Sequence, residues 1–455
     1  MKTKLTPSAR LAAALLIFSL ILSAAGCGQV PVETPSGTEK ETAGTAGETS
    51  RETETAGENE TKKSSSGTVK AGNLMEGIDP EPVEGKAPDA AFTTSQYDFA
   101  AKLLTSSYAD DGSNCLVSPL SVMLALAMTA NGAANNTLAQ MLKVLGNGMS
   151  MDDLNAYLYQ YVKDLPTSKS AKLAIANSIW MNDRGDFSVL NDFLRSAASW
   201  YGADIYKMPF NDQTVKEINN WVSKNTDKMI KKIVDDLGEK DRMFLINAIC
   251  FDAKWAMPFY STLDMLFTEA DGTQKKVGMM RSQEGEYYAG ENYTGFAKRY
   301  ADGYKYVAVL PDKDTSLDEF IAGLDGEKLA SILGSASYAK VNIGLPKYSY
   351  DYSTSLALRL ENMGMTDAFN DLAADFSRMS DTEPLVIAGV IHKTFIEVTE
   401  AGTRAAAVTA VTMAQATAIQ TEPPKEVILD RPFLYMIVDT ENNLPIFIGT
   451  VNSVE

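Results

Sequence analysis

The chain has very few of the side chains on which metal and nucleophilic chemistry depends. Its 455 residues include one histidine, His392, and three cysteines, Cys27, Cys115 and Cys250. Zinc sites usually need several histidine or cysteine ligands, so this set gives no basis for one. Neither a G-x-x-x-x-G-K-[ST] nor a G-x-G-x-x-G sequence is present to hold phosphates. We therefore expect no metal and no cofactor.

The single histidine also limits catalytic interpretations. His392 lies between Ile391 and Lys393 in a strand-like segment, 385–399. A Ser-His-Asp or Cys-His hydrolase needs one histidine, so a triad remains open, but no G-x-S-x-G sequence accompanies it. A single histidine in a strand is more typical of a structural hydrogen-bonding residue. Because the sequence contains no recognisable catalytic motif, we expect that the chain is not an enzyme.

The cysteines and the net charge bear on two further properties, disulfide pairing and the binding of anionic polymers. Cys115 and Cys250 could pair, but each lies in an apolar run, which favours two buried thiols. Lys and Arg number 41 against 59 Asp and Glu, a net charge of −18. An acidic chain without a basic stripe is not expected to bind a phosphate backbone, and the same charge disfavours activation by heparin.

Residues 1–27 have the pattern of a targeting segment. Basic residues at positions 2, 4 and 10 precede an apolar run, Leu11–Leu22, and small residues lead from it to Cys27. This ending resembles the lipobox of bacterial lipoproteins. The resemblance implies cleavage before Cys27, lipidation of its thiol and attachment to the extracellular face of a bacterial membrane. The alternative is an ordinary secretion signal. The apolar run is shorter than the roughly 20 residues that span a bilayer.

Residues 28–89 are rich in Thr, Glu, Gly and Ser and nearly free of aromatic residues. Such a segment buries too little apolar surface to offset its ordering entropy, so we predict a disordered tether. A flexible chain of this length has a reach of about 40–45 Å. It would hold the rest of the protein away from the membrane surface.

Residues 90–455 show no internal repeat and no second linker, which indicates one large domain. Helical periodicity predicts helices over Gln96–Tyr108, Ser118–Gly132, Thr137–Leu145, Met151–Val162, Val189–Tyr201, Thr214–Met229 and Thr354–Met363. Alternating or short apolar runs predict strands over Leu173–Met181, Phe244–Phe251, Tyr304–Leu310, Lys340–Leu345, Leu385–Thr399, Val427–Leu429, Phe433–Asp439 and Ile446–Val451. Helices dominate the first half and strands the second, which predicts an α+β fold with a largely antiparallel sheet.

A run of small residues, Glu400–Thr409, follows the last long strand-like segment. Small side chains alternating with period 2 could enter a sheet between two strands without a clash. Gly402 near its start supplies a hinge with few backbone restrictions. The run can therefore be strand or loop, which suggests a conformational switch.

Segments along nearly the whole domain resemble the serpin family in order and spacing. They are Asn114–Met128, Asn131–Ala134 with Thr137, Phe244–Trp255 with Pro258-Phe259, Val341–Lys347, Leu360–Met365, Ala368-Phe369, Ala374–Ser377, Val390–Lys393, Glu400–Thr409, Asp430–Leu434 and Phe447–Gly449. The resemblance implies a large central, mostly antiparallel sheet with two smaller sheets, about eight or nine helices and an exposed reactive-centre loop.

The resemblance also implies residue roles. A polar cluster called the shutter, beneath the point where the main sheet parts, corresponds to Ser118, Ser121, Asn247 and His392. The breach, where the loop first enters, corresponds to Trp255, Lys347 and Glu400, and we expect Lys347 and Glu400 to lie near each other. The hinge corresponds to Glu400, Gly402, Thr403, Ala405, Ala406, Ala407 and Thr409. If Thr403 points inward, Arg404 points toward solvent. Arg404 and Ala401 depart from the acidic or charged residues common in the family.

By the same resemblance, a protease attacks the loop as a substrate, forms an acyl-enzyme and is trapped in a covalent 1:1 complex when the cleaved loop inserts as a strand. Insertion of about 15 residues would move the attached protease roughly 50 Å. Spacing from the hinge places the reactive bond at Ala416-Thr417, whereas spacing from Pro432 places it at Gln420-Thr421. No Lys or Arg occurs over 411–419, so elastase- or subtilisin-like targets fit best.

Several alternatives remain open. The loop could belong to a non-inhibitory serpin, although residues 400–420 contain no proline that would block insertion. The target could be a papain-like cysteine protease. A solute-binding lipoprotein would need two similar α/β lobes, which the strand-rich second half disfavours. We expect the domain to be a monomer.

Overall fold

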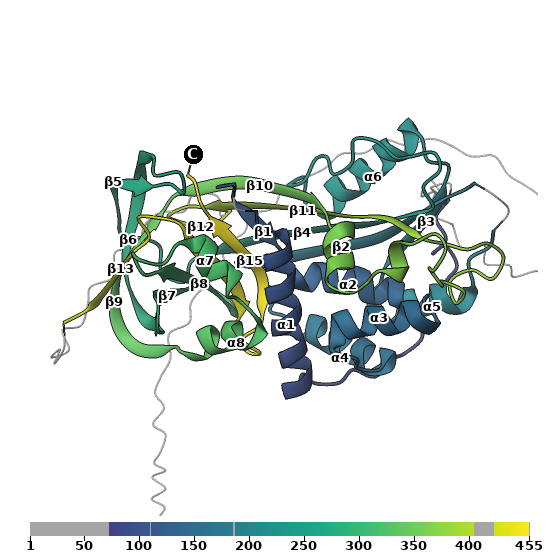
Figure 1. Ribbon diagram of the computed structural model, residues 1–455, viewed down its shortest axis with the longest axis horizontal. Helices are drawn as coiled ribbons and strands as arrows, with labels where there is room; N and C mark the ends of the chain where they lie inside the picture. The colour runs from purple at the N-terminus through teal and green to yellow at the C-terminus, as the bar shows by residue number, and fades with distance from the viewer. Residues whose placement is uncertain (1–71, 110, 185–186, 405–422, 455) are drawn as a thin grey trace, which may run out of the picture. The chain divides into compact units, whose positions relative to one another are not determined.

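The computed structural model describes residues 72–109, 111–184, 187–404 and 423–454, in which helices pack around two sheets (Figure 1). The α-helices in these ranges are α1 (Ala90–Ser107), α2 (Pro119–Ala130), α3 (Asn135–Gly146), α4 (Met151–Asp164), α5 (Asn191–Tyr201), α6 (Asp212–Asn225), α7 (Leu317–Ala322), α8 (Gly326–Gly334) and α9 (Ala357–Asn362), with a 3-10 turn η1 (Asp367–Phe369). The strands are β1 (Cys115–Val117), β2 (Ala171–Asn182), β3 (Asp204–Met208), β4 (Met243–Lys254), β5 (Ser261–Thr268), β6 (Gln274–Ala289), β7 (Tyr293–Arg299), β8 (Tyr304–Pro311), β9 (Ser337–Pro346), β10 (Tyr348–Ser355), β11 (Ile387–Val398), β12 (Gly402–Thr403), β13 (Lys425–Ile428), β14 (Phe433–Asp439) and β15 (Pro445–Val451).

The six-stranded sheet carries the site. Its strand order is β10-β11-β12-β4-β2-β3, and β11 and β4 also pair directly. Most neighbours are antiparallel, but β11 with β4 and β2 with β3 are parallel. The two-residue strand β12 lies between β11 and β4 and is antiparallel to both. The predicted α+β class with a mostly antiparallel central sheet is confirmed.

The remaining described strands form one connected, nine-stranded sheet. Its order is β1-β15-β14-β8-β7-β6-β9-β13, with β5 paired to β6. Two smaller sheets were expected from the sequence. They are joined here because β6 is 16 residues long, pairs with β5 along one part and β7 along another, and shifts its register against β9 between Glu284 and Glu286.

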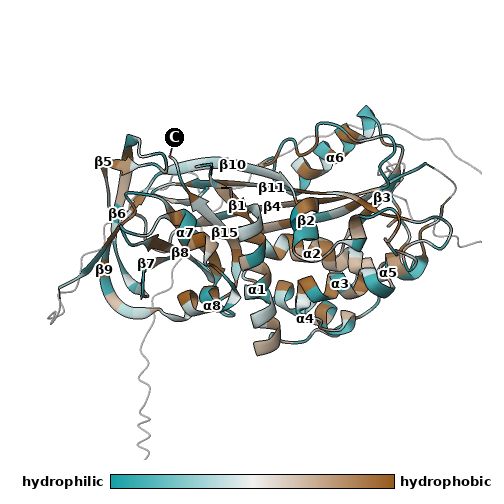
Figure 2. Cartoon of the chain, in the orientation of Figure 1, coloured by the Kyte–Doolittle hydropathy of each residue, from teal (hydrophilic) through white to brown (hydrophobic). Residues whose placement is uncertain are grey.

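Both faces of the six-stranded sheet are buried at its central strand β4. Along β4, Leu245 and Ile249 belong to the main core, which includes residues of α2, while Ile246 and Ala248 belong to a second core under α6. Figure 1 shows α2 and α6 on opposite sides of the strands, and Figure 2 shows hydrophobic residues along β4. A strand buried on both faces reads as a nearly continuous apolar run, here interrupted at its middle by Asn247, which is why β4 was recognisable from sequence.

Helix α2 begins where the sequence predicted. Ser118 is its N-cap and accepts a hydrogen bond from the Ser121 backbone N–H, and Pro119 occupies the first helical position. All twelve of its residues are buried. The cap therefore places the side chains of Ser118 and Ser121 inside the molecule, directly beneath the sheet.

Several predicted boundaries are wrong: the first helix begins at Ala90 instead of Gln96, and the end of the tether and the start of the last helix also differ. The tether was predicted to reach residue 89, yet Gly72 accepts a hydrogen bond from the Lys207 N–H and Leu74 donates one to the Ile205 carbonyl, both beside β3. Three apolar residues, Leu74, Met75 and Ile78, explain this because they pack against the core. The rest of the tether, Cys27 and the targeting segment lie outside the described residues.

Another wrong boundary is the start of the last predicted helix. Thr354 and Ser355 belong to β10, and α9 spans only Ala357–Asn362. Within the described ranges, none of the helices has the length and apolar character needed to cross a bilayer.

Candidate functional site

The site is the junction between β11 and β4, which is closed along one half and separated along the other. The parallel ladder runs from Ile387 opposite Met243 to Lys393 opposite Ala248. Both strands continue, to Val398 and Lys254, but the described residues show no further pairing between them. At the far end Thr403 of β12 pairs with Val398 on one side and Ala253 on the other.

The shutter residues Ser118, Ser121, Asn247 and His392 form one buried hydrogen-bond network at the last paired positions of this ladder. His392 lies directly opposite Asn247, and their Nδ1 and Oδ1 atoms are 2.5 Å apart. The Ser118 backbone N–H donates to His392 Nε2 at 3.1 Å. Asn247 Nδ2 donates to Ser121 Oγ at 2.5 Å. The structure brings the four residues together, and their network connects both strands to the N-terminus of α2.

The partners of His392 determine its tautomer. Because Nε2 accepts from a backbone N–H, the ring proton is on Nδ1, where it donates to the Asn247 carbonyl oxygen. The ring is fully buried, and burial lowers the pKa of His392 to about 3. The ring is therefore neutral at pH 7. Its role in this geometry is structural, as the sequence analysis favoured.

This burial predicts a pH dependence of stability. As pH falls below 6.5, the unfolded chain binds a proton at His392 that the folded chain does not bind. Between pH 6 and 4 the imidazole should lower the free energy of unfolding by about 1.4 kcal/mol per pH unit. Urea unfolding of the wild type and of His392→Gln, which keeps an acceptor for Ser118, measures the difference. Equal pH slopes for the two proteins would contradict this assignment.

Of the breach residues, Lys347 and Glu400 form an ion pair, and Trp255 contacts the residues on either side of Glu400. Lys347 Nζ is 2.5 Å from Glu400 Oε1, and Thr262 Oγ1 donates to the same oxygen at 2.8 Å. Partial burial of Glu400 opposes its ionisation, but hydrogen bonds from Lys347 and Thr262 outweigh it, so the pKa of Glu400 is lowered. Since both partners are more than a third exposed, this pair should stabilise the fold by less than about 1 kcal/mol.

Trp255 holds the chain as it leaves β11. Its indole N–H donates to the Thr399 carbonyl at 2.9 Å, and its backbone N–H donates to the Ala401 carbonyl at 3.0 Å. The indole stacks on the Tyr300 ring with a centroid distance of 4.3 Å. These contacts direct the chain back toward the space between β11 and β4.

The first hinge residues already occupy that space. Thr403 is 1% exposed, and its hydroxyl is 2.6 Å from the Tyr300 hydroxyl. Arg404 is half-buried, has a φ of 51° and places its guanidinium over the Phe395 ring. Thr403 therefore points inward in this structure, the case for which the sequence indicated that Arg404 would point toward solvent. Arg404 is less exposed than expected because Phe395 covers it.

The other predicted loop residues lie outside the described residues. These are the hinge residues Ala405, Ala406, Ala407 and Thr409 and the two candidate reactive bonds, Ala416-Thr417 and Gln420-Thr421.

The sequence analysis missed three residues of the site. Tyr300 anchors Thr403, Thr262 supports Glu400, and Asn177 accepts a hydrogen bond from Asn247 Nδ2 at 2.6 Å. Asn177 could have been noticed as an amide inside an apolar strand. Tyr300 and Thr262 carry no local signal, since their roles depend on contacts between distant segments.

The remaining candidate chemistry can be placed. Cys115 and Cys250 are buried free thiols, and burial raises the pKa of Cys115 to about 12 and that of Cys250 to about 11. Both prefer the unreactive thiol form at pH 7. Among the described residues, no group of three or more His, Cys, Asp or Glu side chains is arranged to hold a metal ion.

Comparisons with known proteins agree with this geometry. The family model described as Serpin (serine protease inhibitor) matches residues 94–454. A serpin-like protein of Thermococcus kodakarensis is 31% identical over 75% of this chain and 81% of its own length. Serpin B6 of Pongo abelii is 32% identical over 78% of this chain and 97% of its own. The crystal structure of the thermophilic serpin Tengpin in its native state has a TM-score of 0.80 at 46% identity, covering 84% of this chain and 99% of that one.

Proposed function

Since the chain belongs to the serpin family, we propose that it inhibits extracellular serine endopeptidases as a suicide substrate, trapping each target by inserting its own loop between β11 and β4. The observation that carries the proposal is that β12 is already antiparallel to both strands while these are parallel to each other. An inserted strand would replace one parallel ladder with two antiparallel ones, which are slightly more stable per residue.

The register of β11 and β4 also suits insertion of a strand between them. From Gly389 to Lys393 each β11 residue faces the β4 residue numbered 145 lower, as His392 faces Asn247, and the same offset relates Val398 to Ala253 across Thr403. The offset changes only at Ile387, beyond a register shift. Insertion would therefore need the two strands to move apart by one strand spacing, about 4.8 Å, without sliding along each other.

Continuing the pairing of Thr403 assigns a place to each loop residue. Each step forward in the loop matches one step back along β11, so residue 405 would lie opposite Ile396, residue 409 opposite His392, and residue 414 opposite Ile387, where β11 begins. This supports Ala416-Thr417 over Gln420-Thr421 as the reactive bond, because Ala416 would follow the last inserted position closely.

The loop side chains fit the two faces. Residues 405, 407 and 409 would share the buried face of Thr403 and are Ala, Ala and Thr, so little volume has to be accommodated. Thr409 would meet the shutter, where its hydroxyl could find partners at His392 and Asn247. Residues 411 and 413, Val and Met, would add apolar contacts near the start of β4.

The proposed reaction stops at the acyl-enzyme. The catalytic serine Oγ of the target forms an ester with the Ala416 carbonyl, and the peptide bond breaks to release the amine of Thr417. Insertion of about a dozen residues, at about 3.3 Å each, would carry the ester and its protease about 40 Å before water attacks it. This is somewhat shorter than the sequence alone indicated, because β11 begins at Ile387.

The same proposal includes target class and location. Residues 411–419 contain no Lys or Arg and, apart from Gln415, are small or apolar, which favours elastase- or subtilisin-like targets over trypsin-like ones. A lipid at Cys27 would hold the monomer on the extracellular face of a bacterial membrane.

Incubation with pancreatic elastase tests the proposal. A 1:1 product that survives boiling in detergent is expected, together with a released fragment whose first residue is Thr417. Trypsin serves as the matched control and should give no such product. Cleavage by elastase without any stable product would refute inhibition, and a fragment starting at Thr421 would move the reactive bond.

A further inference from the structure

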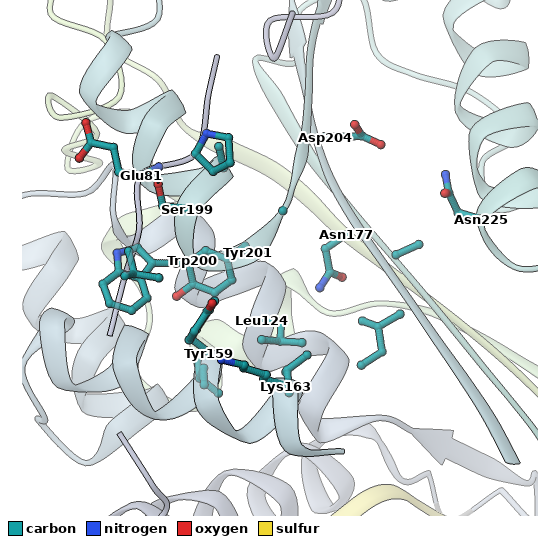
Figure 3. Close-up of a pocket in the computed structure, with 18 of the residues that line it drawn as sticks. Glu81, Leu124, Tyr159, Lys163, Asn177, Ser199, Trp200, Tyr201, Asp204 and Asn225 are labelled. Carbon is teal, nitrogen blue, oxygen red and sulfur yellow. Dashed lines mark hydrogen bonds between the residues drawn. The ribbon is translucent and has the colours of Figure 1, made fainter. Parts of the chain in front are cut away.

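A buried lysine lies beneath the breach. Charged side chains usually reach solvent, as Glu81 and Lys163 do where they line a cavity of about 770 Å³ beside β2 (Figure 3). Lys298 of β7 differs, because its side chain is only 1% exposed. Burial of an ammonium group is costly even when the group is paired, so the position of this lysine needs an explanation.

Glu284 of β6 compensates the charge of Lys298. Lys298 Nζ lies 2.6 Å from Glu284 Oε1 and donates to Ser282 Oγ at 3.2 Å. Ser282 Oγ in turn donates to Glu284 Oε1 at 2.5 Å. Burial lowers the pKa of Lys298, and the carboxylate of Glu284 opposes that shift. The three polar groups are all bonded to one another, which fixes the place of the ammonium group.

The ammonium group faces two aromatic rings, those of Trp255 and Phe259, which we call the breach rings. Lys298 Nζ is 4.3 Å from the centroid of the Phe259 ring and 5.7 Å from that of the Trp255 ring. The two rings meet edge to face, with centroids 6.0 Å apart, and both are buried. A cation within about 6 Å of a ring centroid is attracted to the ring, most strongly where water is excluded. Lys298 therefore restrains both rings.

Trp255 and Phe259 hold three consecutive carbonyls where the chain leaves β11. Trp255 donates to the carbonyls of residues 399 and 401, and the Phe259 backbone N–H donates to the carbonyl of residue 400 at 3.3 Å. Residues 399–401 form the turn that sends Thr403 between β11 and β4. The start of the loop thus rests on two residues whose rings contact one buried cation.

The next residue of β7 provides a matched comparison. Arg299 forms an ion pair with Glu286 of β6, but its side chain is 62% exposed. Because side chains alternate along a strand, Arg299 and Lys298 lie on opposite faces of β7. The two ion pairs therefore join the same strands with the same charges, and only the pair of Lys298 contacts the breach rings.

We propose that Lys298 is a positioning residue for loop insertion: its cation keeps the breach rings in the orientation that holds residues 399–401 and so retains Thr403 between β11 and β4. This role rests on the proposed function, in which insertion has to outrun the attack of water on the ester. A turn that opens more often would let Thr403 leave its place and would delay insertion. The charge beneath the breach thereby determines how many cleavage events end in trapping.

Hydrogen exchange of the uncleaved full chain, followed by mass spectrometry, tests the positioning role without any protease. Lys298→Met removes the cation and nearly keeps the volume, so the backbone amides of Trp255 and Phe259 should exchange about tenfold faster. Amides of β14, in the main core, should exchange as in the wild type. Arg299→Met is the control and should change neither set. Wild-type exchange of both breach amides in Lys298→Met would overturn the proposal.

The double variant Lys298→Met/Glu284→Gln separates positioning from stability. It removes both charges, and the glutamine amide keeps an acceptor for Ser282. Replacing a buried ion pair by neutral groups of similar volume is often neutral for stability, so the thermal midpoint should stay within about 3 °C of the wild type. The breach amides should nevertheless exchange as fast as in Lys298→Met. Wild-type exchange in the double variant would mean that the two charges only compensate each other, and would overturn the positioning role.

The link to trapping has its own readout. Lys298→Met and the double variant should need roughly threefold more inhibitor per elastase trapped than the wild type, whereas Arg299→Met should not. Fast exchange with an unchanged stoichiometry would overturn the link. A wild-type chain that forms no stable complex with elastase would contradict the proposed function instead, and hydrogen exchange would still decide whether Lys298 positions the breach rings.

Discussion

Replacing Thr403 with arginine should convert the protein from an inhibitor into a substrate. Thr403 is 1% exposed and bonded to Tyr300 between β11 and β4, so an arginine would be expelled from this space in the uncleaved protein and would have to re-enter it, without a partner, when the loop inserts. An unpaired buried charge costs several kcal/mol, and each 1.4 kcal/mol is a factor of ten in partitioning. The fraction of elastase trapped per cleavage event should therefore fall at least a hundredfold, as measured from the inhibition stoichiometry.

Arg404→Ala is the matched control on the neighbouring residue. The Arg404 side chain is half-buried over Phe395, on the opposite face from Thr403. Its removal should change the stoichiometry less than twofold. If Thr403→Arg inhibited as well as the wild type, the buried position of Thr403 would have no part in trapping.

Cleavage of the loop should make the protein much more stable. On insertion, the six-stranded sheet would exchange the parallel ladder between β11 and β4 for two antiparallel ladders. Roughly ten additional hydrogen bonds, at about 1 kcal/mol each, would raise the unfolding free energy by about 10 kcal/mol. The thermal midpoint should rise by about 20 °C, measured by circular dichroism before and after cleavage with a protease that is not trapped.

Cleaved Thr403→Arg gives the comparison for this prediction. It loses the same peptide bond but should insert poorly, so its midpoint should rise by only a few degrees. A wild-type midpoint unchanged by cleavage would mean that the sheet does not accept the loop.

Long, strongly patterned elements were predictable from the sequence because their own residues determine them. β4 reads as strand since both of its faces are buried, and α2 has a Ser-Pro start. The shutter and breach residues were predicted from motifs resembling one family, and the structure brings each set together. The period of a strand indicated that Thr403 and Arg404 face opposite sides, but not which of the two is buried.

The features of the fold and of the site that were not predicted depend on contacts between distant segments, which no local sequence pattern encodes. Tyr300 is an ordinary aromatic residue of a strand region until the chain places it against Thr403, over a hundred residues away. Residues 72–89 resemble a linker in sequence because their few apolar side chains lie among polar ones. In the structure Leu74, Met75 and Ile78 nevertheless pack against the core. The long β6 joins two expected sheets because it changes partners along its length, which its sequence does not mark.

The central claim is that residues following Thr403 become a strand between β11 and β4. A crystal structure of the loop-cleaved protein tests this most directly. We predict a new strand, antiparallel to both neighbours, with Ala405 opposite Ile396 and Phe251 and Thr409 beside His392 and Asn247. A cleaved structure in which His392 still pairs with Asn247 in the closed ladder, with the loop outside the sheet, would contradict the account.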